Sequence, residues 1–239
     1  MKTLVFDFRA DWGHFRKFFT TSSPLTFSIM PPTAVYGLLG AVIGLSKKDN
    51  RYLQYLNYQT VQLAIQLKRP IKKVRWGMNL INTKGNIWVP KYRREGAHTQ
   101  IRTEFLKDPD YRLYIHVEDD HLFQQLIYHI RHHRSVYTPC MGLSECIGDF
   151  TFVRVDEFEE VTDDKKVEVL TAIPLYLLKK GLDIQAGKNY FKETLPFDMK
   201  PDREVTQYEE VLFEANGLPI NGSLKRYWQN NKREVITFL

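Results

Sequence analysis

The chain has 239 residues, of which 43% are hydrophobic, so it is long and apolar enough to bury the core of a globular protein. Its two cysteines, Cys140 and Cys146, exclude a disulfide framework and a four-cysteine zinc site within the chain. The net charge of +6 is unevenly distributed. Residues 1–139 hold 21 Lys and Arg against 10 Asp and Glu, a balance of +11, whereas residues 140–239 hold 13 against 18, a balance of −5. The N-terminal part therefore suits a polyanionic partner.

The first 45 residues predict a strand followed by a helix. Residues 4–8 are an apolar strand, and residues 31–45 form a helical pattern in which Thr33 could cap the first turn. Gly37, Gly40 and Gly44 recur on one side of this helix, and each costs about 1 kcal/mol relative to alanine. We therefore expect this side to lie against another backbone, that of a sheet. The apolar stretch is too short to span a bilayer, and no signal peptide is visible, so we expect a cytoplasmic protein without a membrane partner.

The remaining elements alternate between strands and helices. Alternating apolar residues predict a strand at 59–68, and another is predicted at about 71–81. Residues 83–100 lack a core-forming pattern. Strands at 101–106 and 111–117 flank a turn at 107–110, which predicts a hairpin between them. Asp119 or Asp120 can cap a helix over 121–134, and a strand follows at 150–155.

This order of elements predicts an α+β sandwich of the ferredoxin-like or RRM-like kind, with its helices on one face of the sheet. We assign this domain to residues 1–158. After residue 158 the chain becomes acidic and rich in turns, and strands are predicted at 167–178 and 205–215. Residues 159–239 are then a β-rich part that either forms a small second lobe or extends the first sheet.

Three basic segments are candidates for contact with nucleic acid. The loop 9–19 interleaves cations with aromatic rings, which can hold phosphates and stack on bases, although the rings could instead cover a sheet edge. The run 68–75 contains five Lys and Arg and no acid, which a solvated basic turn would also explain, but the following Trp76 and the uneven charge favour a role facing RNA. Residues 91–102 are rich in Arg, Lys and Tyr without a core pattern, which is typical of a functional insertion and predicts a nucleic-acid clamp.

Two later segments have possible binding roles. His129, His132 and His133 lie on one side of the second helix, but no nearby Cys, Asp or Glu completes a metal site, so no metal is predicted. Arg131 and Arg134 favour contact with a phosphate instead. The loop 142–148 has a glycine at each end, which lets backbone amides approach a ligand. No phosphate-binding, dinucleotide-binding or nucleophile motif is found, and no cofactor is predicted.

Three separated segments together resemble a known family. They are Pro-Thr-Ala-Val-Tyr-Gly-Leu-Leu-Gly-Ala at 32–41, the pair 99–102 and 111–115, and Gly-Leu-Ser-Glu-Cys at 142–146. They resemble the fifth CRISPR-associated protein family, a RAMP-type subunit of Cascade, which is the RNA-guided surveillance complex of type I CRISPR systems. The similarity is closest to the type I-B branch. It covers residues 1–155 well and the remainder loosely.

The resemblance implies an RRM-like body, a protruding thumb hairpin at about residues 83–102, and a mainly scaffolding role in antiviral defence. Such a subunit binds the 5′ handle of the crRNA and caps one end of the complex. It contacts the backbone subunit and the large PAM-reading subunit, and through the complex the target DNA. The predicted RNA-binding residues are Arg9, His14, Arg16, Lys17, Lys91, Tyr92, Arg93, Arg94, His98, Arg102, Arg131, Arg134, Gly142 and Ser144.

An enzyme is the main alternative, because one branch of this family cuts CRISPR repeat RNA without a metal. The resemblance implies a catalytic Tyr near the end of the first helix and a Lys-His pair before the second. The matching positions are Leu45, Asp120 and His121, so only His121 is retained. Aspartate in place of lysine opposes the charge that develops on phosphate. We therefore predict a non-catalytic subunit, with endoribonuclease activity through His121 as the alternative. A stand-alone RNA-binding domain is a third hypothesis. It lacks support, because no RNP-type run of Gly, Phe and Tyr is found on a central strand.

Overall fold

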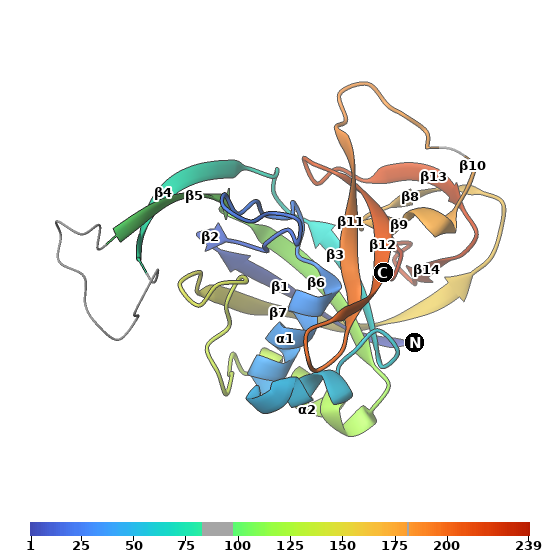
Figure 1. The fold of residues 1–239 in the computed structure, drawn as a ribbon. Coiled ribbons are helices and arrows are strands. Elements are labelled where there is room, and N and C mark those ends of the chain that lie inside the picture. Colours follow the sequence, from blue (N-terminus) through green and yellow to red (C-terminus); the bar gives the residue numbers. More distant parts are fainter. Residues whose placement is uncertain (83–97, 181) are drawn as a thin grey trace.

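The centre of the fold is a sheet built from a β-α-β-β-α-β succession of elements. These elements are β1 (Lys2–Ala10), α1 (Pro32–Ile43), β3 (Val61–Leu67), β6 (Asp110–Val117), α2 (Asp120–Arg131) and β7 (Gly148–Val161). The computed structural model describes residues 1–82, 98–180 and 182–239. The four strands lie in the order β7-β1-β6-β3, and all neighbours are antiparallel. Figure 1 shows α1 and α2 together on one face of the sheet, so the predicted α+β class is confirmed.

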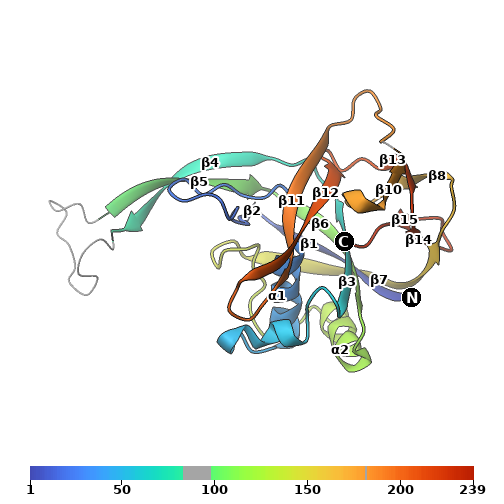
Figure 2. The ribbon, with the colours of Figure 1, turned by 45° about the vertical axis from the view of Figure 1, so that its right-hand side comes forward.

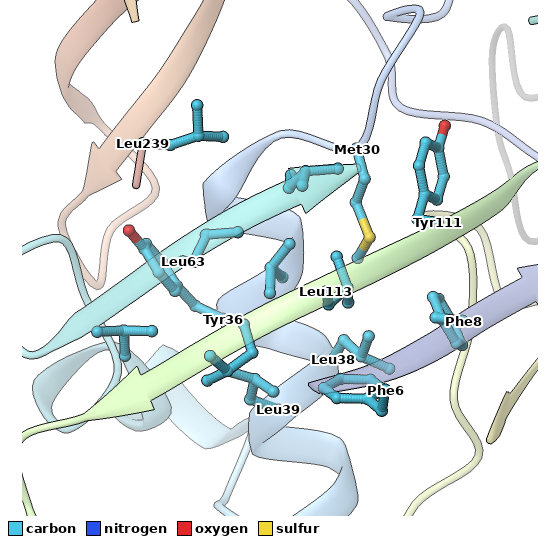
Figure 3. Packing of buried hydrophobic residues seen from close by; sticks show 14 of the residues in the cluster. Phe6, Phe8, Met30, Tyr36, Leu38, Leu39, Leu63, Tyr111, Leu113 and Leu239 are labelled. Carbon is cyan, nitrogen blue, oxygen red and sulfur yellow. The ribbon is translucent and has the colours of Figure 1, made fainter. Parts of the chain in front are cut away.

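Apolar side chains cover both faces of this sheet, because successive residues of a strand point to opposite sides. On the helix face, Phe6 and Phe8 of β1 and Leu113 of β6 share a buried cluster with Tyr36 and Leu39 of α1 (Figure 3). The opposite face has a smaller cluster, formed by Val5, Ala64, Tyr114, Phe158, Trp228, Ile236 and Phe238. The C-terminal residues of the chain therefore complete the second face.

The start and end of α1 are set by proline and glycine. Pro31 is the N-cap residue and Pro32 the first helical residue, and no side chain caps the helix, so Thr33 does not have the predicted role. Gly44 takes a left-handed conformation with φ 82°, and its amide donates to the carbonyl of Gly40. The helix ends there because this conformation is readily available only to glycine.

The glycine side of α1 does not face the sheet. It faces the short helix η1 (Lys48–Gln54) and the segment after α2. A Cβ atom on Gly40 would lie 3.2 Å from Cβ of Tyr52, and one on Gly44 would lie 2.9 Å from the methyl groups of Val136. The predicted contact with a sheet is therefore wrong. The glycines instead make room for an aromatic ring and a valine side chain.

A separate three-stranded sheet contains β2 (Trp12–Gly13), β4 (Lys73–Ile81) and β5 (His98–Lys107), in the order β2-β5-β4. Figures 1 and 2 show β4 and β5 extending as a ribbon away from the central sheet. The hairpin predicted between 101–106 and 111–117 is wrong, because β5 pairs with β4 and β2, whereas β6 pairs with β1 and β3. Asp108, with φ 51°, lies at the turn where the chain passes from one sheet to the other. Most of the predicted thumb, residues 83–97, lies outside the described residues.

The second half of β7 continues the central sheet into the C-terminal part. Beyond β7 the strand order is β14-β15-β8-β13-β10. These strands are β8 (Lys166–Val169), β10 (Leu178–Lys180), β13 (Ile220–Leu224), β14 (Tyr227–Asn230) and β15 (Val235–Ile236). The proposed boundary at residue 158 thus falls inside β7, and the C-terminal strands lengthen the same sheet. The single strand predicted at 167–178 is divided into several short elements.

A third sheet packs against α1. It consists of β11 (Tyr190–Met199), β12 (Val205–Glu214) and β9 (Ile173–Pro174), with the turn η3 (Leu175–Leu177) following β9. Leu195, Phe197 and Phe213 of this sheet belong to the same buried cluster as α1. Within the described part of the chain, no helix is long and apolar enough to cross a membrane.

Candidate nucleic-acid interface

Two of the predicted loop residues make contacts inside the protein. The ring of His14 is 4% exposed, and its Nδ1 lies 2.7 Å from the carbonyl oxygen of Glu104 in β5. Burial lowers the pKa of His14, so the ring is neutral at pH 7. Lys17 Nζ donates to Glu193 Oε1 of β11 at 2.9 Å, and their side chains are only 18% and 12% exposed. Both residues therefore fix the loop, and Lys17 has its charge already neutralised.

Arg16 lies between these two residues but points outward. It is exposed, and its Nη2 donates to the carbonyl oxygen of Thr20 at 2.8 Å. This bond stiffens the guanidinium without neutralising it, because a carbonyl carries no net charge. Arg16 is therefore the cation of this loop that is best placed for a phosphate.

Most of the basic run at 68–75 is neutralised by carboxylates from distant strands. Lys68 lies 2.6 Å from Asp7 of β1, and Arg69 lies 3.4 Å from Asp110 of β6. Lys73 and Arg75 lie 3.6 and 3.4 Å from Glu104. Only Lys72 of the five cations has no ion pair with a described residue. The run contains no acid of its own, so the sequence alone predicted more free positive charge there than the folded protein has.

The ribbon contains two of the predicted residues in described positions. His98 and Arg102 of β5 are exposed and form no ion pair with described residues, whereas Lys91, Tyr92, Arg93 and Arg94 lie outside the described residues. Near the base of the ribbon, the Trp76 ring is 43% exposed and its centroid lies 3.9 Å from that of Trp12. These two rings present an exposed aromatic surface that could stack on a base.

A further group of cations surrounds the C-terminal end of α2. Arg131 lies over the ring of Phe152 at 5.0 Å, and Arg134 is exposed without an ion pair among the described residues. Arg9 Nη2 and His133 Nε2 both approach Asp149, at 3.6 and 3.1 Å. Arg9 is therefore partly neutralised, while the two arginines of α2 and its following turn keep their charge.

The loop after α2 places glycine where its backbone requires it. Gly142 has φ +92°, and a Cβ atom there would lie 2.0 Å from the carbonyl oxygen of His14. The amides of Cys146 and Gly148 donate to the carbonyl oxygens of Leu143 and Pro139, whereas residues 143–145, including the exposed Ser144, donate no backbone hydrogen bond to described residues. Their amides are consequently available to a ligand, although the carboxylate of Glu145, which accepts from Ser144 Oγ at 3.2 Å, reduces the attraction for an anion.

The structure also reveals a cavity that the sequence did not predict as a site. It has a volume of about 670 Å³ and lies along the glycine side of α1. Lys47, Lys48 and Arg203 line it together with Tyr52, Tyr137 and Gly142, and no Asp or Glu belongs to its described lining. The spacing of Gly37, Gly40 and Gly44 was the one feature of the sequence that pointed to this side of α1. It was interpreted as close packing of the helix against a sheet.

Comparison with known proteins identifies the family. The family model described as CRISPR-associated protein (Cas_Cas5) matches residues 3–214, which is most of the chain. The chain belongs to the Cas5 family. The family resemblance of the three sequence segments is thereby confirmed. No curated protein sequence matches the chain.

Solved structures share the Cas5 chain's fold at low sequence identity. A CRISPR protein from Archaeoglobus fulgidus is 13% identical, with a TM-score of 0.57 over 98% of this chain and 97% of that chain. A chain of a CRISPR RNA-guided surveillance complex is 11% identical, with a TM-score of 0.54 over 91% of each. A chain of the Type III-B Cmr-beta complex bound to cognate target RNA and AMPPnP is 12% identical, with a TM-score of 0.50 over 92% and 86%. These similarities establish a common fold.

His121, the residue that the alternative endoribonuclease hypothesis names as catalytic, lines a second cavity. His121 Nε2 lies 3.0 Å from Gln125 Nε2, and a cavity of about 440 Å³ extends from these residues to Ile43, Tyr128 and His129. No Lys or Arg belongs to its described lining. Asp120 accepts a hydrogen bond from Gln124 at 3.4 Å. No group of three or more His, Cys, Asp or Glu side chains that could hold a metal occurs among the described residues.

Proposed function

We propose that this Cas5 family member is a non-catalytic subunit of a type I CRISPR surveillance complex, of the I-B kind, and that it binds the 5′ handle of the crRNA. The strand order β7-β1-β6-β3, with both helices on one face, supports the ferredoxin-like or RRM-like domain that this function requires. Two of the structures with the same fold belong to complexes described as RNA-guided or RNA-bound. The proposed partners are the crRNA, the backbone subunit, the large subunit and, through the complex, target DNA near the PAM.

The observation that carries the proposal is the division of the basic residues into neutralised and free groups. Lys17, Lys68 and Arg112 are bound to carboxylates, so they stabilise the fold. Arg16, Arg102, Arg131 and Arg134 are exposed and have no ion pair with a described residue. Free, exposed cations attract a polyanion, and these four lie on the loop, on the ribbon, on α2 and on the turn after α2.

The absence of a cation from the described lining of the His121 cavity supports a non-catalytic role. Metal-free cleavage of RNA needs a base for the 2′-hydroxyl and positive or acidic groups for the developing charge. His121 could supply the base, but its described neighbours supply no positive charge. Metal-independent processing of repeat RNA is therefore the second candidate function, favoured only by the retained histidine.

Co-expression with the neighbouring genes tests the proposal. We expect a stoichiometric complex that contains RNA of uniform length, and a lone monomer without RNA would refute it. In the triple variant Arg16→Gln, Arg102→Gln, Arg134→Gln, each lost phosphate contact should reduce the slope of log K against log salt by about 0.7. The matched control replaces three paired lysines, Lys166, Lys179 and Lys192, by glutamine, and should leave the slope unchanged.

Catalysis is tested separately with purified protein, cognate repeat RNA and EDTA. We expect no specific cleavage. Specific cleavage that is lost in His121→Ala would overturn the non-catalytic assignment while leaving RNA binding intact.

A further inference from the structure

We propose that the cavity beside α1 is a nucleotide pocket, which takes up an unstacked base of the bound single-stranded RNA while three cations at its rim hold the adjoining phosphates. This inference rests on the proposed RNA-binding function and assigns it a specific place. The cavity, about 670 Å³, lies within the size range of small-molecule sites. It is an open cavity bordered by α1, by η1 with the residues before it, by the loop 137–142 and by Arg203 between β11 and β12.

The charges around the cavity favour an anion. Lys47, Lys48 and Arg203 are exposed, and none of them has an ion pair with a described residue. Of the acids next to them in the sequence, Asp49 lies 3.9 Å from Arg51, whereas Asp202 accepts from the amide of Glu204 at 2.9 Å and keeps its charge. Three cations in a described lining without Asp or Glu favour a positive potential at the cavity, which is what successive phosphates of an RNA strand require.

The walls of the cavity favour a base. The ring of Tyr137 is 51% exposed at the cavity and can stack on a nucleobase, a contact that tolerates any base. The hydroxyl groups of Thr33 and Thr138 also line the cavity, and neither bonds to a described residue. They can donate to or accept from a base edge or a ribose hydroxyl. Hydroxyl groups, an aromatic ring and exposed cations in one lining match a nucleotide better than a peptide or a lipid.

The position of Gly37 shows that the space is not required by the protein's own packing. A Cβ atom on Gly40 would lie only 3.2 Å from the Tyr52 side chain, so the packing of Tyr52 explains why position 40 is glycine. A Cβ atom on Gly37 would meet only the Tyr52 hydroxyl, at 3.9 Å, which is ordinary contact distance. Glycine in a helix costs about 1 kcal/mol relative to alanine, yet nothing among the described residues requires it at position 37. A ligand that occupies the cavity would explain why position 37 is glycine.

Gly37→Leu tests the pocket, because Gly37 lines the cavity and a Cβ atom there would have only the Tyr52 hydroxyl within 4 Å. The protein should melt at the same temperature as wild type or higher, since leucine favours the helix. The probe is a fluorescent single-stranded RNA with the 5′-terminal sequence of the RNA recovered from the complex, measured by anisotropy. Affinity should fall about 5- to 150-fold, the range for loss of one stacked base. Ala186→Leu, at an exposed position outside the lining of both cavities, is the control and should bind like wild type.

Single abasic substitutions along the probe identify the base that enters the pocket. At one position, the abasic substitution should weaken the affinity of the RNA for wild type by a similar factor. The same substitution should not weaken its affinity for the Gly37→Leu variant any further. The triple variant Lys47→Gln, Lys48→Gln, Arg203→Gln changes only exposed side chains, and it should reduce the salt slope by about 2 units. If wild type binds the RNA while Gly37→Leu and the triple variant bind it equally well, the pocket is refuted and RNA binding stands. If wild type binds no RNA, both proposals fail.

Discussion

The carboxylate of Glu193 anchors the basic N-terminal loop, and replacing it with glutamine should destabilise the protein strongly. Glu193 accepts from Lys17 Nζ at 2.9 Å and from both the amide and the hydroxyl of Ser28 at 2.8 Å. Lys73 Nζ lies 3.9 Å away. Because only 12% of the Glu193 side chain is exposed, solvent and salt screen these interactions weakly. The loop that carries Arg16 is thus attached to β11 through one buried negative charge.

The magnitude follows from what the substitution leaves behind. Removing one partner of a buried ion pair costs about 3–5 kcal/mol, because the other charge stays buried. Glutamine keeps one acceptor oxygen for Ser28, and Lys73 retains Glu104 at 3.6 Å, so about 2–3 kcal/mol is expected for Glu193→Gln. The control is Glu210→Gln on the adjacent strand. Its ion pair with Lys192, at 2.6 Å, is 49% and 53% exposed and should contribute about 0–1 kcal/mol.

Equilibrium unfolding in urea distinguishes the two variants. With a slope of about 2–3 kcal/mol/M, Glu193→Gln should lower the midpoint by about 1 M and the control by about 0.5 M at most. A double-mutant cycle with Lys17→Met then isolates the pairwise contribution. Equal shifts in the two glutamine variants would refute the argument that burial gives this ion pair its strength.

Three further outcomes are expected. Gly142→Ala should lower the free energy of unfolding by about 1–3 kcal/mol from backbone strain alone, and by more because its Cβ would meet the His14 carbonyl at 2.0 Å; an unchanged melting temperature would contradict this. Burial alone would raise the pKa of Asp7, but hydrogen bonds from Arg112 and a lysine hold it below its usual value, so its stabilisation is present above about pH 4 and is lost as the pH falls further. Urea midpoints between pH 6 and pH 3 should therefore fall less steeply in Asp7→Asn than in wild type. Burial raises the pKa of Cys146 to about 11, so iodoacetamide at pH 8 should modify the other cysteine first, as mass spectrometry can check.

Elements with a local signal could be predicted from the sequence. The apolar run in β1, the alternation in β3 and the apolar face of α2 depend on neighbouring residues only, and these elements appear close to the expected bounds. The pairing of β5 depends on residues far along the chain. Its turn at 107–110 resembles a hairpin turn locally, but the strand partners are β4 and β2, a choice that turn chemistry does not encode.

The candidate interface was predictable only in part, because it too depends on contacts between residues that are far apart in the chain. Counting charges along the sequence identified a basic N-terminal part, but it could not reveal that four of the five cations of one basic run would pair with Asp7, Glu104 and Asp110. The cavity beside α1 joins Lys47 to Arg203, which are far apart in the chain and meet only after folding. The spacing of Gly37, Gly40 and Gly44 did signal an unusual helix side. What that side faces was decided by tertiary structure.

The central position of β1 has a consequence for synthesis of the protein. β1 lies between β6 and β7, and roughly 100 residues separate the end of β1 from the start of β6. At about 5–20 residues per second, this strand leaves the ribosome roughly 5–20 s before its first neighbour exists. During that time its apolar residues have no sheet partner and can associate with other chains. Production of the protein should therefore depend on chaperones, or on slow translation at low temperature, more than its final stability would suggest.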